Sequence, residues 1–170
     1  SDKREEASFL EAASYYKMSQ RFSLDQTDTD TALQKLQSFI NDYPDSEYFE
    51  SANEMVQTLN VKKQQKAFEI AKQYDKVGEF NLPVLFSSIT SMNNFIQENP
   101  GSIYREEAYF IRLKSAIILA QNSTFEKMSQ RFNDALKYYN EFKKNYPNSR
   151  VSKEAETYKS LIDKSLITTS

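Results

Sequence analysis

The sequence predicts an all-α fold, in which antiparallel helix pairs stack side by side as a right-handed solenoid. Three observations predict this fold class. Glycine occurs only twice in 170 residues, which is too rare for the hairpin turns and bulges of a sheet protein. Apolar residues recur at helical spacing along most of the chain. One turn motif occurs three times, and internal repeats of this kind are typical of stacked helical arrays.

The turn motif consists of Phe, four residues, Pro, one residue and Ser, and an alanine follows six residues after the serine. Its copies begin at Phe39, Phe95 and Phe142. Because proline cannot continue a helix, each phenylalanine is expected to be the last large apolar residue of a helix. The serine can accept hydrogen bonds from the free N–H groups that open the next helix. The motif therefore predicts helix, tight turn and helix, with the small alanine allowing close helix packing.

A longer duplication relates the first part of the chain to its last part. Residues 17–22 recur unchanged as residues 127–132, and residues 4–7 recur as residues 105–108. Both segments precede a copy of the turn motif. We therefore expect two copies of one two-helix module, at residues 1–46 and 102–149.

These repeats predict a single domain that covers residues 1–170. Its approximate units are residues 1–44, 46–100 and 102–147, followed by a C-terminal capping helix at residues 150–165. Ser1 stands six residues before Ala7, which is the spacing of serine and alanine in the turn motif. We therefore expect the chain to be a fragment that lacks N-terminal repeats.

The apolar pattern places the individual helices. Residues 29–43, 83–97 and 131–146 each carry one apolar stripe, whereas residues 103–121 are apolar nearly all round and should be the most buried helix. No glycine or proline interrupts the chain between Ser46 and Val77, so we expect one long helix there that Gly78 closes, with a break near Asn60 as the alternative. The capping helix should use one apolar stripe to cover the preceding pair, formed by Val151, Ala155, Tyr158, Leu161 and Ile162.

The composition narrows the classes of function. The chain has no histidine and no cysteine, which excludes thiol nucleophiles, imidazole bases and Cys/His metal sites. Its net charge of −2 leaves no basic excess for phosphates, so nucleic acid is not an expected partner. The acidic run from Asp25 to Asp30 lacks the glycine and the final glutamate of a calcium loop; we expect it to lead into a helix that Asp28 or Thr29 caps. We expect no enzyme activity, no catalytic residue, no cofactor and no metal.

Two groups of residues resemble known families. The spacing of Ala67, Ala71, Tyr74, Gly78 and Phe80 resembles the first helix and turn of a tetratricopeptide repeat. The series of turn motifs is similar to the extended repeats of BamD (YfiO-type) outer membrane lipoproteins, and residues 19–26 resemble a segment of BamD proteins of the Bacteroidetes type. The resemblance extends over essentially the whole chain and corresponds to the C-terminal, tetratricopeptide-like part of that family.

The resemblance to BamD implies a protein-binding scaffold in outer-membrane β-barrel assembly. It implies a location at the periplasmic face of the outer membrane, with a lipid anchor on an N-terminal cysteine that this chain does not contain. The implied partners are the barrel-forming assembly subunit and unfolded outer-membrane proteins. The alternatives are a tetratricopeptide adaptor of another envelope complex, of the YbgF/CpoB kind, or a helical-repeat glycan-capture protein.

The candidate partner-binding residues lie in two places. Tyr15 and Tyr16 are adjacent, so at most one can face the core fully and the other is a candidate contact. For the following segment the sequence leaves loop packing and partner contact open. The last helix should present a polar face to the rim of a partner. The candidate residues are Tyr15, Tyr16, Arg21, Phe22, Asp25, Gln26, Lys153, Glu156 and Lys159.

Overall fold

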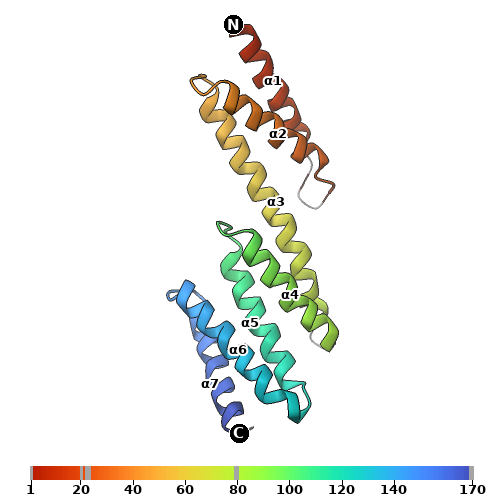
Figure 1. Ribbon diagram of the computed structural model, residues 1–170, viewed down its shortest axis with the longest axis vertical. Coiled ribbons are helices and arrows are strands. Elements are labelled where there is room, and N and C mark those ends of the chain that lie inside the picture. The colour runs from red at the N-terminus through yellow and green to blue at the C-terminus, as the bar shows by residue number, and fades with distance from the viewer. Residues whose placement is uncertain (1, 20, 22–23, 79–80, 169–170) are drawn as a thin grey trace. The chain divides into compact units, whose positions relative to one another are not determined.

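The computed structural model describes residues 2–19, 21, 24–78 and 81–168. Within these residues the backbone forms seven helices and no strand (Figure 1), which confirms the all-α prediction. The helices are α1 (Asp2–Met18), α2 (Thr27–Asp42), α3 (Phe49–Gly78), α4 (Leu82–Glu98), α5 (Arg105–Gln121), α6 (Phe125–Asn145) and α7 (Ser152–Thr168).

The chain divides into two compact units, and each is described by itself. Unit 1 covers residues 1–66 and contains α1, α2 and the first part of α3. Unit 2 covers residues 67–170 and contains the rest of α3 with α4 to α7. The expectation of a single domain stays a prediction.

The three copies of the turn motif fold in the same way. The hydroxyl oxygens of Ser46, Ser102 and Ser149 each accept the backbone N–H two residues ahead, at 3.1, 3.2 and 3.1 Å. The residue before each proline has nearly the same backbone conformation, with φ between −126° and −133° and ψ between 62° and 64°, which lies outside the α region that proline disfavours for its predecessor. The motif phenylalanines are at most 3% exposed, and the alanines Ala52, Ala108 and Ala155 are fully buried. The predicted helix, turn and helix are confirmed at all three positions.

The core of unit 1 lies where α1, α2 and the first turns of α3 meet. Ala12, Leu36 and Phe39 are fully buried. The ring of Phe9 stacks on the ring of Tyr48, with 4.5 Å between the ring centroids. Small residues on α1 therefore allow α2 to approach, and aromatic rings close the end of the pair.

The core of unit 2 is centred on α5, which packs against α4 on one side and α6 on the other. Ten of its residues are buried, more than on any other helix among the described residues, so the prediction of the most buried helix is confirmed. The apolar stripe of α7 covers this core as expected, with Ala155 and Ile162 fully buried and Val151, Tyr158 and Leu161 half-buried against them.

Two boundary predictions differ from the structure. The long helix α3 passes through Asn60 without a break, but it begins at Phe49 rather than Ser46 because the motif serine and the next two residues form the turn. Helix α2 begins at Thr27, so Asp28 and Thr29 lie inside its first turn and do not cap it. Gln26 occupies the capping position instead.

The duplicated segments also differ in burial. Ala108 of α5 is fully buried, whereas its counterpart Ala7 of α1 is exposed. The next residues on the same faces are Ile111, which is 5% exposed, and Leu10, which is 55% exposed. This face is therefore covered in α5, whereas the described residues of unit 1 leave the corresponding face of α1 open.

Candidate partner-binding surfaces

The segment between α1 and α2 folds around the side chain of Gln26, one of the predicted site residues. Its Nε2 donates to the carbonyl oxygens of Arg21 and Leu24, each at 3.0 Å. Its Oε1 accepts the hydroxyl hydrogen of Thr29 at 2.9 Å, and Thr29 is fully buried. Gln26 therefore ties the loop to the first turn of α2, which favours loop packing for this residue.

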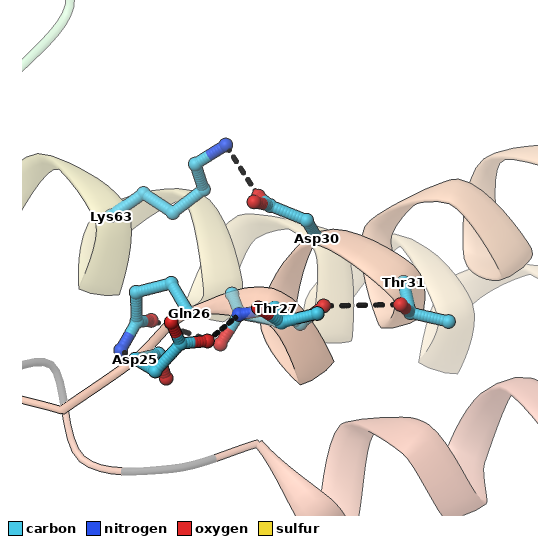
Figure 2. Close-up of polar contacts among 7 residues, drawn as sticks. Asp25, Gln26, Thr27, Asp30, Thr31 and Lys63 are labelled. Atoms are coloured by element: carbon cyan, nitrogen blue, oxygen red, sulfur yellow. Dashed lines mark hydrogen bonds and ion pairs between the residues drawn. The ribbon is translucent and has the colours of Figure 1, made fainter.

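The carboxylates of this segment also make local contacts (Figure 2). Asp25 accepts the backbone N–H of Thr27 at 2.7 Å. Hydrogen bonds from the side chain and backbone of Thr27 hold the pKa of the Asp25 carboxyl below its usual value. Asp30 forms an exposed ion pair with Lys63 of α3 at 2.7 Å. The acidic run is thus used to start α2 and to join it to α3.

Two further lysines of α3 hold the two ends of the loop. Lys62 Nζ donates to Ser19 Oγ at 2.8 Å, and Lys66 Nζ donates to the carbonyl oxygen of Leu24. The two lysines are four residues apart, so they lie on the same face of the helix. The exposed Arg21 lies between these two anchored points, and Phe22 lies outside the described residues.

Tyr15 and Tyr16 both lie half-buried against the core of unit 1. Neither is one of the exposed side chains of α1, although their adjacency suggested that one would point outward. Their rings fill the space between α1 and the neighbouring helices. Both tyrosines therefore contribute to the core of unit 1.

The polar face of α7 is partly engaged with α6. Glu156 accepts the hydroxyl hydrogen of Tyr139 at 2.8 Å and pairs with Lys143 at 2.9 Å. Lys159 pairs with Asp163 at 2.6 Å, one turn further along α7. Lys153 is exposed. Of the three predicted residues, Glu156 and Lys159 contribute to packing and ion pairing, and Lys153 is the exposed one.

The contact between Tyr139 and Glu156 changes how both groups titrate. Burial and the hydrogen bond to Glu156 raise the pKa of Tyr139 to about 12. Hydrogen bonds from Lys143 and Tyr139 lower the pKa of the Glu156 carboxyl. Each group therefore stabilises the protonation state that keeps α6 and α7 together near neutral pH.

A groove that was not predicted from the sequence is formed by α3, α5 and α7, the first helices of successive helix pairs in unit 2. This first-helix groove has a volume of about 530 Å³. Ile103, which is 73% exposed, lies at one end of it beside the start of α5. The walls carry charges of both signs, and Lys72 forms an ion pair with Glu107. The other lining residues include Lys114, Phe110, Arg150 and Glu154.

A second hollow lies on another side of α5, between α4 and α6, and is called the second-helix groove below. It consists of two adjoining cavities of about 330 and 520 Å³ that share the ring of Tyr138. One end has the apolar side chains of Phe86 and Ile89 beside the charged Lys127, Arg131 and Asp134. The other end is basic, with Arg105, Arg112 and Lys137. Neither groove has a periodic signal in the sequence, because each is lined by residues of three different helices.

Arg112 on the floor of the second-helix groove is a buried cation. It is 5% exposed, and its guanidinium lies 4.8 Å from the ring centre of Tyr109 and 4.3 Å from that of Tyr138. It donates to Asn93 at 2.7 Å and pairs with Glu141 at 2.5 Å. Its Nε has no hydrogen-bond acceptor among the described residues.

Two features that would indicate other classes of protein are absent from the described part of the chain. No group of three or more His, Cys, Asp or Glu side chains there is placed to hold a metal ion. No helix there is both long and apolar enough to cross a membrane.

Comparison with protein families gives two matches. Residues 1–84 match the family model of the YfiO outer membrane lipoprotein. Residues 113–149, which contain the whole of α6 and the third turn motif, match that of the tetratricopeptide repeat. A comparison with curated proteins gave no match. The chain therefore carries a YfiO-type region followed by a tetratricopeptide repeat, which confirms the expected resemblance.

Proposed function

We propose that this chain, with its YfiO-type region and its tetratricopeptide repeat, is a non-catalytic, BamD-like scaffold for outer-membrane β-barrel assembly. The two family matches support a protein-interaction scaffold in outer membrane assembly. The proposed partners are the periplasmic repeats of the barrel-forming subunit and unfolded outer-membrane proteins. The proposed location is the periplasmic face of the outer membrane, reached through a lipid anchor outside residues 1–170.

The observation that carries the proposal is the first-helix groove of unit 2. Helical repeats bind partners on the extended surface that their stacked helices form. The groove has both kinds of contact that such a surface needs: an exposed apolar side chain, Ile103, and charges of both signs along its walls. A partner segment that buries Ile103 gains hydrophobic free energy, and the charges fix its direction.

Binding is proposed to leave the fold unchanged. The groove is held by helices whose ends are fixed by the repeated Pro-x-Ser turns and by the buried face of α5. A preformed groove loses little conformational entropy when it is occupied. The polar face of α7, with Lys153 at its exposed part, would then contact the rim of the partner.

The proposal is tested by calorimetric titration of the chain with purified periplasmic repeats of a barrel-forming subunit. Ile103→Asp should weaken binding about tenfold or more, as expected for a central apolar contact, while Lys153→Glu should cost about 0.2–1 kcal/mol as a rim charge. The matched control is Ile167→Asp on α7, whose side chain is 80% exposed; it should bind like wild type.

Two outcomes would contradict this assignment. Binding that is strong but insensitive to Ile103→Asp places the interface elsewhere on the chain. Failure of these repeats to bind, together with binding of an unrelated periplasmic partner, would favour the envelope-adaptor alternative.

A further inference from the structure

The second-helix groove collects positive charge in a chain that is acidic overall. Five basic and two acidic side chains line its two cavities among the described residues. The whole chain has 22 basic and 24 acidic residues. The groove is therefore a local reversal of the charge of the molecule, and a cleft with one sign of charge attracts ligands of the other.

The arginines at the basic end of the groove are held in place by specific contacts. Arg112 keeps its charge while 95% buried, between two tyrosine rings and two hydrogen-bonding partners. Arg105 stands beside it and donates to the carbonyl oxygens of Ile96 and Pro100. Holding the guanidinium of Arg112 at the floor costs desolvation free energy. An acidic ligand recovers part of that cost, because its carboxylates add a favourable charge interaction at low dielectric.

The other end of the groove is suited to a large apolar side chain. Phe86 is 47% exposed, and the guanidinium of Arg131 lies 5.0 Å from its ring centre. Ile89 and Leu119 also line this end of the groove, beside the polar side chains of Lys127 and Asp134. An incoming aromatic or aliphatic side chain would bury Phe86 further, which is favourable at about 25 cal/mol per Å² of apolar surface removed from water.

We propose that the second-helix groove binds an acidic peptide segment of a partner protein, with one large apolar residue at the Phe86 end and carboxylates along Arg105, Arg112 and Lys137. The net positive charge of the groove and the exposed ring of Phe86 at one end carry this assignment. It does not rest on the first-helix groove or on the partner proposed above. It adds a second binding surface to the same helix, α5.

The test uses the full chain and two fluorescent twelve-residue peptides, measured by fluorescence anisotropy. One peptide has a phenylalanine followed by glutamates, and the other has the same phenylalanine followed by lysines. The glutamate peptide should bind at least tenfold more tightly than the lysine peptide, and its affinity should fall as salt is raised. Equal binding of the two peptides, or no binding of the glutamate peptide, would overturn the proposal.

Two pairs of variants locate the binding. Phe86→Asp and Lys137→Glu should each weaken the glutamate peptide about fivefold or more. Their controls are Phe125→Asp, at a side chain 71% exposed, and Lys144→Glu, an exposed lysine of α6; neither residue lines the two cavities of the groove. Equal losses in variant and control overturn the assignment. Vesicles of anionic phospholipid serve as a further probe, and groove-dependent binding to these alone would also overturn it.

Discussion

The hydroxyl groups of Ser88 and Ser115 lie 2.9 Å apart, and both residues are fully buried. Ser88 belongs to α4 and Ser115 to α5, so two small side chains lie at this buried contact between the helices. Each hydroxyl satisfies the other inside an apolar core. Both the size and the polarity of these two side chains are therefore set by the contact.

The first prediction follows from the size of Ser115. Ser115→Leu should lower the free energy of unfolding by about 1–3 kcal/mol, because the larger side chain must displace α4 and leaves the Ser88 hydroxyl without its partner. Ser14 stands at the corresponding position of the duplicated segment in α1 and is exposed. Ser14→Leu should therefore change stability by less than about 0.5 kcal/mol. Urea denaturation of both variants measures the difference.

The second prediction concerns the serine of the turn motif. Ser102 accepts the backbone N–H of Tyr104 at 3.2 Å, so Ser102→Ala should remove this cap and destabilise the protein by about 0.5–2 kcal/mol. Ser160→Ala, at an exposed position of α7, is the control and should be close to neutral. Thermal denaturation followed by circular dichroism compares them. An equal effect of the two substitutions would show that the hydroxyl at the turn is not used.

The third prediction is the loss of stability at high pH that Tyr139 causes. Its pKa is about 12 in the folded chain against 10.0 in the unfolded one, so folding favours the protonated phenol. The resulting stabilisation is complete below about pH 10 and is lost as the pH rises through 12, and a shift of this size corresponds to about 2–3 kcal/mol.

The measurement is urea denaturation at pH 9 and pH 12 for the wild type and for Tyr139→Phe. The wild type should lose more stability over this interval than the variant, because Phe cannot ionise and other titrating groups are common to both. A variant with the same loss would assign the pH dependence to other residues.

The fourth prediction tests the role of Gln26 in the loop before α2. Gln26→Ala removes the hydrogen bonds to Arg21, Leu24 and Thr29 and should lower stability by about 1 kcal/mol. Amide hydrogen exchange should become faster in the first turn of α2. Gln57→Ala, at an exposed position of α3, should leave exchange there unchanged. If Gln26→Ala keeps wild-type exchange, partner contact becomes the better explanation for this residue.

The repeated turn was predictable because all its determinants are local. Proline acts on the residue before it, and the motif serine acts on the N–H two residues ahead, so sequence spacing alone specifies the contacts. The buried face of α7 was predictable for a related reason, since a helix of known phase has only one apolar side. Ala155 and Ile162 confirm it.

The start of α2 was predicted wrongly because burial of Thr29 outweighs its preference for the capping position. Asp28 and Thr29 are favoured capping residues by type, but Thr29 is drawn inside by burial in unit 1. Its hydroxyl then bonds to Gln26 one turn earlier. That outcome depends on tertiary packing and not on the local sequence.

The two grooves were not predictable from periodicity. Arg112 lies on a helix that is apolar nearly all round, and its partners Asn93 and Glu141 come from two other helices. Sequence distance gives no sign that these three residues meet. A buried arginine in an apolar helix was the only signal in the sequence, and it did not show which residues would surround it.

The claim that unit 2 binds a partner on its first-helix groove is tested most directly by hydrogen–deuterium exchange. The chain is measured alone and then saturated with the purified periplasmic repeats of a barrel-forming subunit. If the partner binds there, the bound chain should exchange amide hydrogens more slowly than the free chain at residues 67–74, 103–114 and 150–154, where the groove is formed. Protection confined to residues 2–66, with these three segments unchanged, would contradict it.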